Sequence, residues 1–120
     1  GMSGTLTIGG SSSGEGNLIS GNIRSGILLH DSVNVTIQGN RIGTNAAGDA
    51  ALTNGESAIS QSAGSGWTIG GMSDWSSGQL TGAGNLIVQS GGGFSGVQAG
   101  NNLTFQGNFV GTDITGTLPL

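Results

Sequence analysis

The chain has 120 residues and a formal net charge of −4, with 27 glycines, no cysteine and only two cationic side chains, both arginine. The absence of cysteine excludes disulfides and thiolate metal sites. Two arginines are too few for phosphate-based nucleic-acid binding or a polybasic membrane patch, and no apolar run approaches the roughly 18–20 residues of a transmembrane helix, so we expect neither nucleic acid as a partner nor membrane insertion.

In chain order, three kinds of short strand pattern recur, each with apolar residues at alternate positions. The first three patterns are Leu6–Ile8, Leu18–Ile19 and Gly26–Leu29. The later copies are Val35–Ile37, Arg41–Gly43, Ala58–Gln61, Trp67–Ile69, Leu86–Ile87, Gly96–Ala99, Leu103–Phe105 and Phe109–Gly111. Glycine and serine interrupt every window, so no segment favours a helix.

A repeat relates the two halves of the chain. Gly16–Ile19 returns as Gly84–Ile87, and Asn34–Asn40 returns as Asn102–Asn108, each shifted by 68 positions (84 − 16 and 102 − 34). Such a repeat indicates a solenoid, in which each unit buries its apolar face against its neighbours. We therefore expect residues 1–120 to form one all-β domain of two 68-residue units. Each unit would make two coils of three short strands, about four coils in all, the first incomplete. Because the chain stops within a motif, we also expect a longer parent protein.

The alternation within the strands predicts which side chains face the interior. The residues predicted to point inward are Leu6, Ile8, Val35, Ile37, Trp67, Ile69, Leu103 and Phe105. A threonine lies between each inward pair and must point outward: Thr7, Thr36, Thr68 and Thr104. With coils about 4.8 Å apart, the body would be on the order of 15–20 Å tall.

Glycine–asparagine pairs at positions 21–22, 39–40 and 107–108 are predicted to form the corners. Both residue types tolerate the left-handed conformation of a tight turn. Stacked asparagines also hydrogen-bond to one another along the axis of such a structure.

Inserts between the strands are the expected surface loops, where function usually resides. Residues 46–56 and 114–120 follow the same strand type, and a short insert at 11–16 corresponds to a longer one at 72–84. The long insert carries Met72, Trp75 and Leu80, which either pack onto the coil as a cover or form a shallow patch beside Asp74. We favour the cover. Asp74 and Trp75 are the candidate ligand-binding residues, since an aromatic face is a platform for a sugar ring.

The segments 34–55, NVTIQGNRIGTNAAGDAALTNG, and 102–120, NLTFQGNFVGTDITGTLPL, carry a family resemblance. They resemble right-handed parallel β-helix repeats, in particular the Asn/Gly-rich tandem repeats of large bacterial surface and secreted proteins, with units like GNxIGTDxxGTxxLxN. The resemblance covers the chain from about Leu6 to Leu120. It implies a single-stranded right-handed parallel β-helix and an extracellular or cell-surface location. The fold hosts lyases, glycosidases, adhesins and phage tailspikes, so it does not choose an activity.

No catalytic constellation is visible, and we expect no enzyme, cofactor or metal. The six acids are scattered one per loop, although glycoside hydrolysis needs two carboxylates at roughly 5–10 Å. His30 and Asp31 are adjacent, with Arg24 and Arg41 nearby in sequence, so His30 or Arg41 is the candidate base of an enzyme; because neighbouring strand residues face opposite ways, a polar corner is favoured over a base. Oxygen ligands for calcium occur within one loop, at Asn45, Asp49, Asn54 and Glu56, yet their spacing fits no known calcium motif, and a solvated loop is favoured.

The leading hypothesis for function is therefore a non-catalytic structural or adhesive segment of a larger extracellular bacterial protein, with neighbouring β-helix repeats as its partners. The alternative is a carbohydrate-binding or polysaccharide-degrading module. A minor alternative is ice binding through the outward threonines, although the second threonine rank usual in such proteins is absent. Open solenoid ends also predict self-association.

Overall fold

The protein is all-β, as predicted. A computed structural model describes residues 6–12, 14–55, 58–74, 76–88, 97–98 and 104–119. These residues form strands and turns, and among them no helix is long and apolar enough to cross a membrane. The molecule measures 38 × 31 × 20 Å along its principal axes.

Eleven of the strands form three parallel sheets. Sheet one contains β1 (Leu6–Gly9), β4 (Val35–Gln38), β7 (Thr68–Gly70) and β12 (Thr104–Gln106), in that order. Sheet two contains β2 (Leu18–Ile19), β5 (Arg41–Ile42), β10 (Leu86–Ile87) and β13 (Phe109–Val110). Sheet three contains β3 (Ile27–Val33), β6 (Ile59–Ser65) and β11 (Val97–Gln98). A separate antiparallel hairpin joins β8 (Ser73–Asp74) to β9 (Thr81–Gly82).

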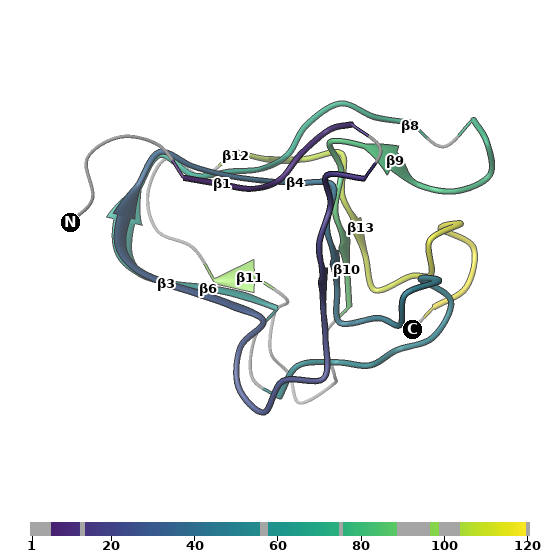
Figure 1. The fold of residues 1–120 in the computed structure, drawn as a ribbon, viewed down its shortest axis with the longest axis horizontal. Helices are drawn as coiled ribbons and strands as arrows, with labels where there is room; N and C mark the ends of the chain where they lie inside the picture. The colour runs from purple at the N-terminus through teal and green to yellow at the C-terminus, as the bar shows by residue number, and fades with distance from the viewer. Residues whose placement is uncertain are drawn as a thin grey trace.

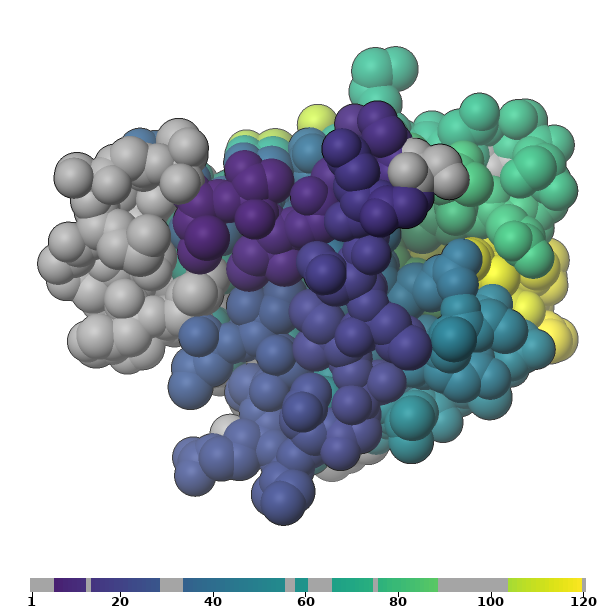
Figure 2. Space-filling model, viewed as in Figure 1, coloured from purple at the N-terminus to yellow at the C-terminus, as the bar shows by residue number. Residues whose placement is uncertain are grey.

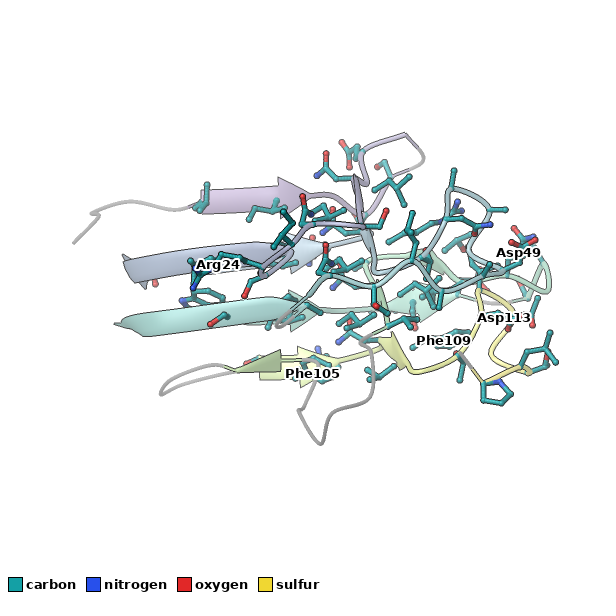
Figure 3. All side chains as sticks on the ribbon, turned by 90° about the horizontal axis from the view of Figure 1, so that it is seen from below. Arg24, Asp49, Phe105, Phe109 and Asp113 are labelled. Carbon is teal, nitrogen blue, oxygen red and sulfur yellow. The ribbon has the colours of Figure 1, made fainter. Side chains whose placement is uncertain are left out.

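The chain visits sheets one, two and three in a fixed cycle. It makes three passes, and a fourth that reaches β12 and β13. Figure 1 looks along the shortest axis, so the three sheets appear as three sides with their strands overlapping. Figure 3, turned by 90°, shows the strands of successive passes stacked in layers.

Two strands of sheet three are longer than the sequence predicted. Both β3 and β6 have seven residues, and they pair in parallel as far as Val33 and Ser65. Each ends immediately before a left-handed corner, at Asn34 with φ 55° and at Gly66 with φ 74°. The prediction stopped early because polar residues in the second half of each strand break the apolar alternation.

The interior consists of the inward residues of successive passes. In the middle of the stack Val35, Ile37 and Ile69 of sheet one are buried together with Trp67, which directly precedes β7. Buried beside them are Ile42 and Ile87 of sheet two and Ile27 and Ile59 of sheet three. Burying a side chain of this size contributes about 1.5–3 kcal/mol.

The ends of the same columns are less buried than predicted. Phe105 pairs in register with Ile69 but is 40% exposed, and Val110 is 51% exposed. Leu6 and Ile8, at the other end, are half-buried. These residues belong to the outermost strands of their sheets, so a neighbouring strand covers them on one side only. Leu103, also predicted inward, lies outside the described residues.

A column of four asparagines, here called the asparagine ladder, runs through all four passes: Asn17, Asn40, Asn85 and Asn108. Each Nδ2 donates to the Oδ1 of the next asparagine, at 3.1, 3.0 and 2.9 Å. The backbone N–H of each donates to the same oxygen at 2.8–3.0 Å. The predicted hydrogen bonding along the axis is thus present. Asn40 and Asn85 are fully buried, and every donor and acceptor in the middle of the ladder is satisfied.

At the corners glycine and asparagine have different tasks. Gly39 and Gly107 both have φ 69°, and a Cβ on either would lie about 2 Å from a backbone oxygen of a neighbouring pass. Only glycine fits there. The asparagines that follow do not adopt positive φ, and Asn34 is the one non-glycine residue that does so in the described chain. The asparagine is needed for its side-chain amide, which reaches the neighbouring passes.

Candidate functional site

A cleft with a volume of about 570 Å³ lies between the loop after β1, the outer face of sheet two and the hairpin. Its size falls within the range of small-molecule sites. Figure 2 shows the surfaces that border it, where the purple N-terminal segment, the green hairpin and the blue-teal loop after β5 meet on one face.

The floor of the cleft is an apolar cluster on the outside of sheet two. Leu86 of β10 is buried together with Leu80 of the hairpin and Ile114 of the last loop, and Phe109 packs beside them. Backbone hydrogen bonds fix the hairpin to the last loop and the last loop to the loop around Gly48: Leu80 donates to the Ile114 oxygen and Ile114 donates to the Gly48 oxygen, both at 2.8 Å. Outward side chains of β10 and β13 are therefore covered by loops, which alternation alone does not predict.

The two loops beside the floor are copies of each other. Loop 44–51 is closed by a bridge between Thr44 and Ala51, and loop 112–119 by one between Thr112 and Pro119. In the first, Asn45 Oδ1 accepts from the backbone of Asp49 and Ala50 at 3.1 and 3.3 Å.

In the second loop Asp113 takes the place of Asn45. Its Oδ1 accepts from the Thr115 hydroxyl at 2.6 Å and from the backbone N–H groups of Thr115, Thr117 and Leu118. The hydrogen bond from the Thr115 hydroxyl is the main cause that lowers the pKa of Asp113 below its ordinary 3.8. The backbone donors lower the pKa further, whereas burial of the carboxylate acts in the opposite direction. Asn45 in the first loop and Asp113 in the second are thus the residues that close their loops.

The rim of the cleft carries one charge of each sign. Asp74 lies at the end of β8, where its carboxylate accepts a hydrogen bond of 2.8 Å from the Ser76 backbone. That bond, reinforced by the Ser76 side chain, lowers the pKa of Asp74, so the group is anionic at neutral pH. Arg41, an outward residue of β5, also lines the cleft and donates from Nη1 to the Ala46 oxygen. Asn17, Ser11, Ser12 and Thr81 add polar groups to the rim.

The long insert acts as a cover through one of its predicted residues, and whether it also binds a ligand stays a prediction. Leu80 is only 7% exposed and covers Leu86, whereas Met72 is 90% exposed and covers nothing. Asp74 lines the cleft, while Trp75 lies outside the described residues. The cleft position of Arg41 was missed. Its outward place in the Arg41–Gly43 strand was a usable signal, but loops distant in sequence complete the cleft.

The four outward threonines lie in one register. Thr7 pairs with Thr36, Thr36 with Thr68, and Thr68 with Thr104. Thr7 and Thr104 are exposed, and Thr36 and Thr68 are half-exposed. The next outward position along β4 is Gln38, which has no hydroxyl; its side-chain amide donates to the Gly70 oxygen at 3.1 Å. Ice binding by this rank stays a prediction.

The four residues weighed as calcium ligands do not share one arrangement. Asn45 Nδ2 donates to Asp49 Oδ1 at 2.7 Å, but Asn54 is buried elsewhere and its Oδ1 accepts two hydrogen bonds from Asn22 at 3.1 and 2.8 Å. Glu56 lies outside the described residues. Over the part of the chain that the structure describes, no three His, Cys, Asp or Glu side chains gather as metal ligands. His30 and Asp31 lie on β3, and the structure does not describe their side chains.

Comparisons of the chain with protein-family models, curated proteins and solved structures find no match. A function for this chain therefore has to come from its own geometry and chemistry.

Proposed function

We propose that the chain is a segment of a right-handed parallel β-helix and a non-catalytic structural or adhesive element of a larger extracellular bacterial protein. Its partners are then neighbouring repeats of the same kind. The cyclic order of the three parallel sheets supports the β-helix, and the general right-handedness of parallel crossovers supports its hand.

The observation that carries this proposal is the asparagine ladder. It crosses from the first repeat unit into the second with the same bond pattern, Asn40 to Asn85 being equivalent to Asn17 to Asn40 and Asn85 to Asn108. The residues of the repeat motif are therefore used for stacking and for closing loops. A sequence selected for stacking fits a spacer that holds other parts of a surface protein in place and displays loops.

The test is to lengthen the stack in register. Residue 120 occupies the same repeat position as residue 52 (120 − 68), so joining residues 53–120 directly after residue 120 adds one further unit. The stability of a stacked repeat protein rises with each added unit and interface. We expect a higher midpoint of thermal unfolding and one cooperative transition. The control carries the same segment on a flexible Gly/Ser linker; equal midpoints for the two proteins would refute a stacking role.

A second function is favoured by the cleft. The rim carries one guanidinium, one carboxylate, and hydroxyl and amide groups, and the floor is apolar. This combination suits a neutral polar ligand with one apolar face, such as a sugar. We propose a carbohydrate as the ligand class. On a glycan array, Asp74→Ala and Arg41→Ala should each lose binding that Asp49→Ala, an acid outside the cleft lining, retains. A wild-type protein that binds no glycan would remove this second function and leave the first untouched.

A further inference from the structure

The two ends of the asparagine ladder are chemically different. Every ladder asparagine donates in the same direction, from the first pass toward the last. At the first end, Asn17 Oδ1 accepts no hydrogen bond in the described chain, whereas each later Oδ1 accepts two. At the last end, the one acceptor of Asn108 Nδ2 among the described residues is the Ile69 oxygen, and no described ladder residue accepts from its backbone N–H.

The apolar columns end in the same two places. Phe105 and Val110 leave about half of their surface uncovered at the last pass. Ile8 and Ile19 begin the same two columns at the first pass, where they are partly buried. The last pass thus offers unpaired donors beside uncovered apolar groups, and the first pass offers an unpaired acceptor beside partly covered ones.

We propose that a second copy of this chain binds head to tail, its first pass resting on the last pass of the other copy. This inference rests on the proposed stacking function and adds its polarity. Asn108 would donate to Asn17 of the second copy as Asn85 donates to Asn108. The contact repeats an interface that already exists between passes, with β1 and β2 of one copy beside β12 and β13 of the other.

Two like ends do not match. Two first passes would bring acceptor against acceptor at Asn17, and two last passes would bring donor against donor at Asn108, leaving these groups unpaired in the contact. The contact is therefore heterologous and does not close on itself, so it produces linear chains instead of a dimer. Among the described residues, the outermost strand of sheet three is β11, which belongs to the third pass, so the contact is argued from sheets one and two alone.

Blocking one end at a time tests the polarity. Val110→Lys places a charge at the last pass and Asn17→Lys removes the acceptor at the first pass. The control, Met72→Lys, makes the same charge change on a hairpin residue that is 90% exposed. By light scattering we expect the wild type and Met72→Lys to gain mass steadily with concentration. Each end variant alone should stay monomeric, and their equimolar mixture should stop at a dimer.

A disulfide cross-link tests the same head-to-tail contact through residues that do not belong to the interior. Thr7 and Thr104 are exposed and end one column, so head-to-tail contact puts them on adjacent strands, within the Cα separation of a disulfide. Because the chain has no cysteine, Thr7→Cys and Thr104→Cys each provide a single thiol. We expect a disulfide-linked heterodimer when the two are mixed and oxidised, at yields above those of either alone or of Met72→Cys.

Three results would overturn the inference: a wild type that is monomeric at every concentration, an end variant that dimerises by itself, or a Thr7→Cys variant that cross-links to itself as well as to Thr104→Cys. The stacking function is judged separately by the lengthened chain. If that chain is stabilised while separate copies do not associate, only the head-to-tail contact is wrong.

Discussion

At the residue scale, the repeated Gly-Asn pair combines two requirements that no single residue meets. Gly39 allows the backbone to turn where a Cβ would strike Gly10 of the neighbouring pass. Asn40 then uses its carboxamide as acceptor and donor at once, toward Asn17 on one side and Asn85 on the other. A carboxamide suits this position because it carries both an acceptor and two donors on a short side chain.

Replacing Asn85 should therefore be far more damaging than replacing Asn17. Asn85→Ala leaves two buried donors of Asn40 and the Ile37 oxygen without their partner. At about 1–3 kcal/mol for each of these three unsatisfied groups, we expect the free energy of unfolding to fall by at least about 3 kcal/mol. Asn17→Ala, at the exposed end, should cost about 1 kcal/mol. Denaturant titration of both variants measures the difference, and equal losses would contradict the role of the ladder.

Asp113 should make the protein sensitive to acid. Its folded-state pKa is below the ordinary 3.8, so it stabilises the fold fully above about pH 4, and this contribution is lost as the pH falls through the lower folded-state value. In Asp113→Asn, which copies the Asn45 of the other loop, that contribution should disappear. Melting temperatures measured from pH 6 to pH 2 should fall less steeply in the variant. Parallel curves for the two proteins would argue against this assignment.

At the element scale, the loops are held by the same kind of periodic bonding as the strands. The hairpin, loop 112–119 and loop 44–51 lie side by side through the backbone bonds from Leu80 to Ile114 and from Ile114 to Gly48. Figure 3 shows Asp49 and Asp113 on the same side of the molecule, in the two copied loops. These bonds therefore fix the backbones of the loops that surround the apolar floor of the cleft.

The cover formed by the hairpin gives a prediction with a close control. Leu80→Ala removes a buried side chain from the contact with Leu86 and Ile114, and we expect a loss of about 2 kcal/mol or more in the free energy of unfolding. Met72→Ala, in the same hairpin but exposed, should change it by less than about 0.5 kcal/mol. Chemical denaturation distinguishes the two. If Leu80→Ala were as harmless as its control, the hairpin would not be a cover.

The strand positions were predictable because the alternation and the 68-residue repeat can both be seen directly in the sequence. The hydrogen-bond partners within the asparagine ladder were harder to predict. Asn17 and Asn85 precede short strands and lack the Gln-Gly-Asn context of Asn40 and Asn108, so only the spatial stacking of passes brings the four together. The cleft depends on three loops meeting, which periodicity does not encode. The exposure of Phe105 was missed because alternation predicts a direction and not what covers the side chain.

At the whole-molecule scale, the stack has a stable middle and weaker ends. Residues of the second and third passes, such as Ile37, Ile42, Ile69 and Ile87, are fully buried between neighbours on both sides. Residues in the same columns of the outer passes are partly or half exposed. In a structure where each pass contacts only its neighbours, local opening should therefore begin at both ends.

Amide hydrogen exchange should reveal this gradient directly. The N–H of Val88 donates to the Ile42 oxygen and that of Leu86 to the Asn40 oxygen, both at 2.8 Å, between the two middle passes. The N–H of Gly111 makes an equally short bond to the Ile87 oxygen, but it belongs to the last pass. Since these bonds have the same length, a difference in protection reports the free energy of opening each pass and not bond geometry.

We expect Leu86 and Val88 to be protected at least tenfold more than Gly111, which corresponds to about 1.4 kcal/mol in opening free energy. Raising the protein concentration should reduce this difference in protection if copies stack head to tail, because a second copy would then cover the last pass. In the Val110→Lys variant the difference in protection should stay constant as the protein concentration rises. Uniform protection from the first pass to the last, measured at low concentration, would mean that the molecule opens as a single unit and that its ends are as stable as its middle.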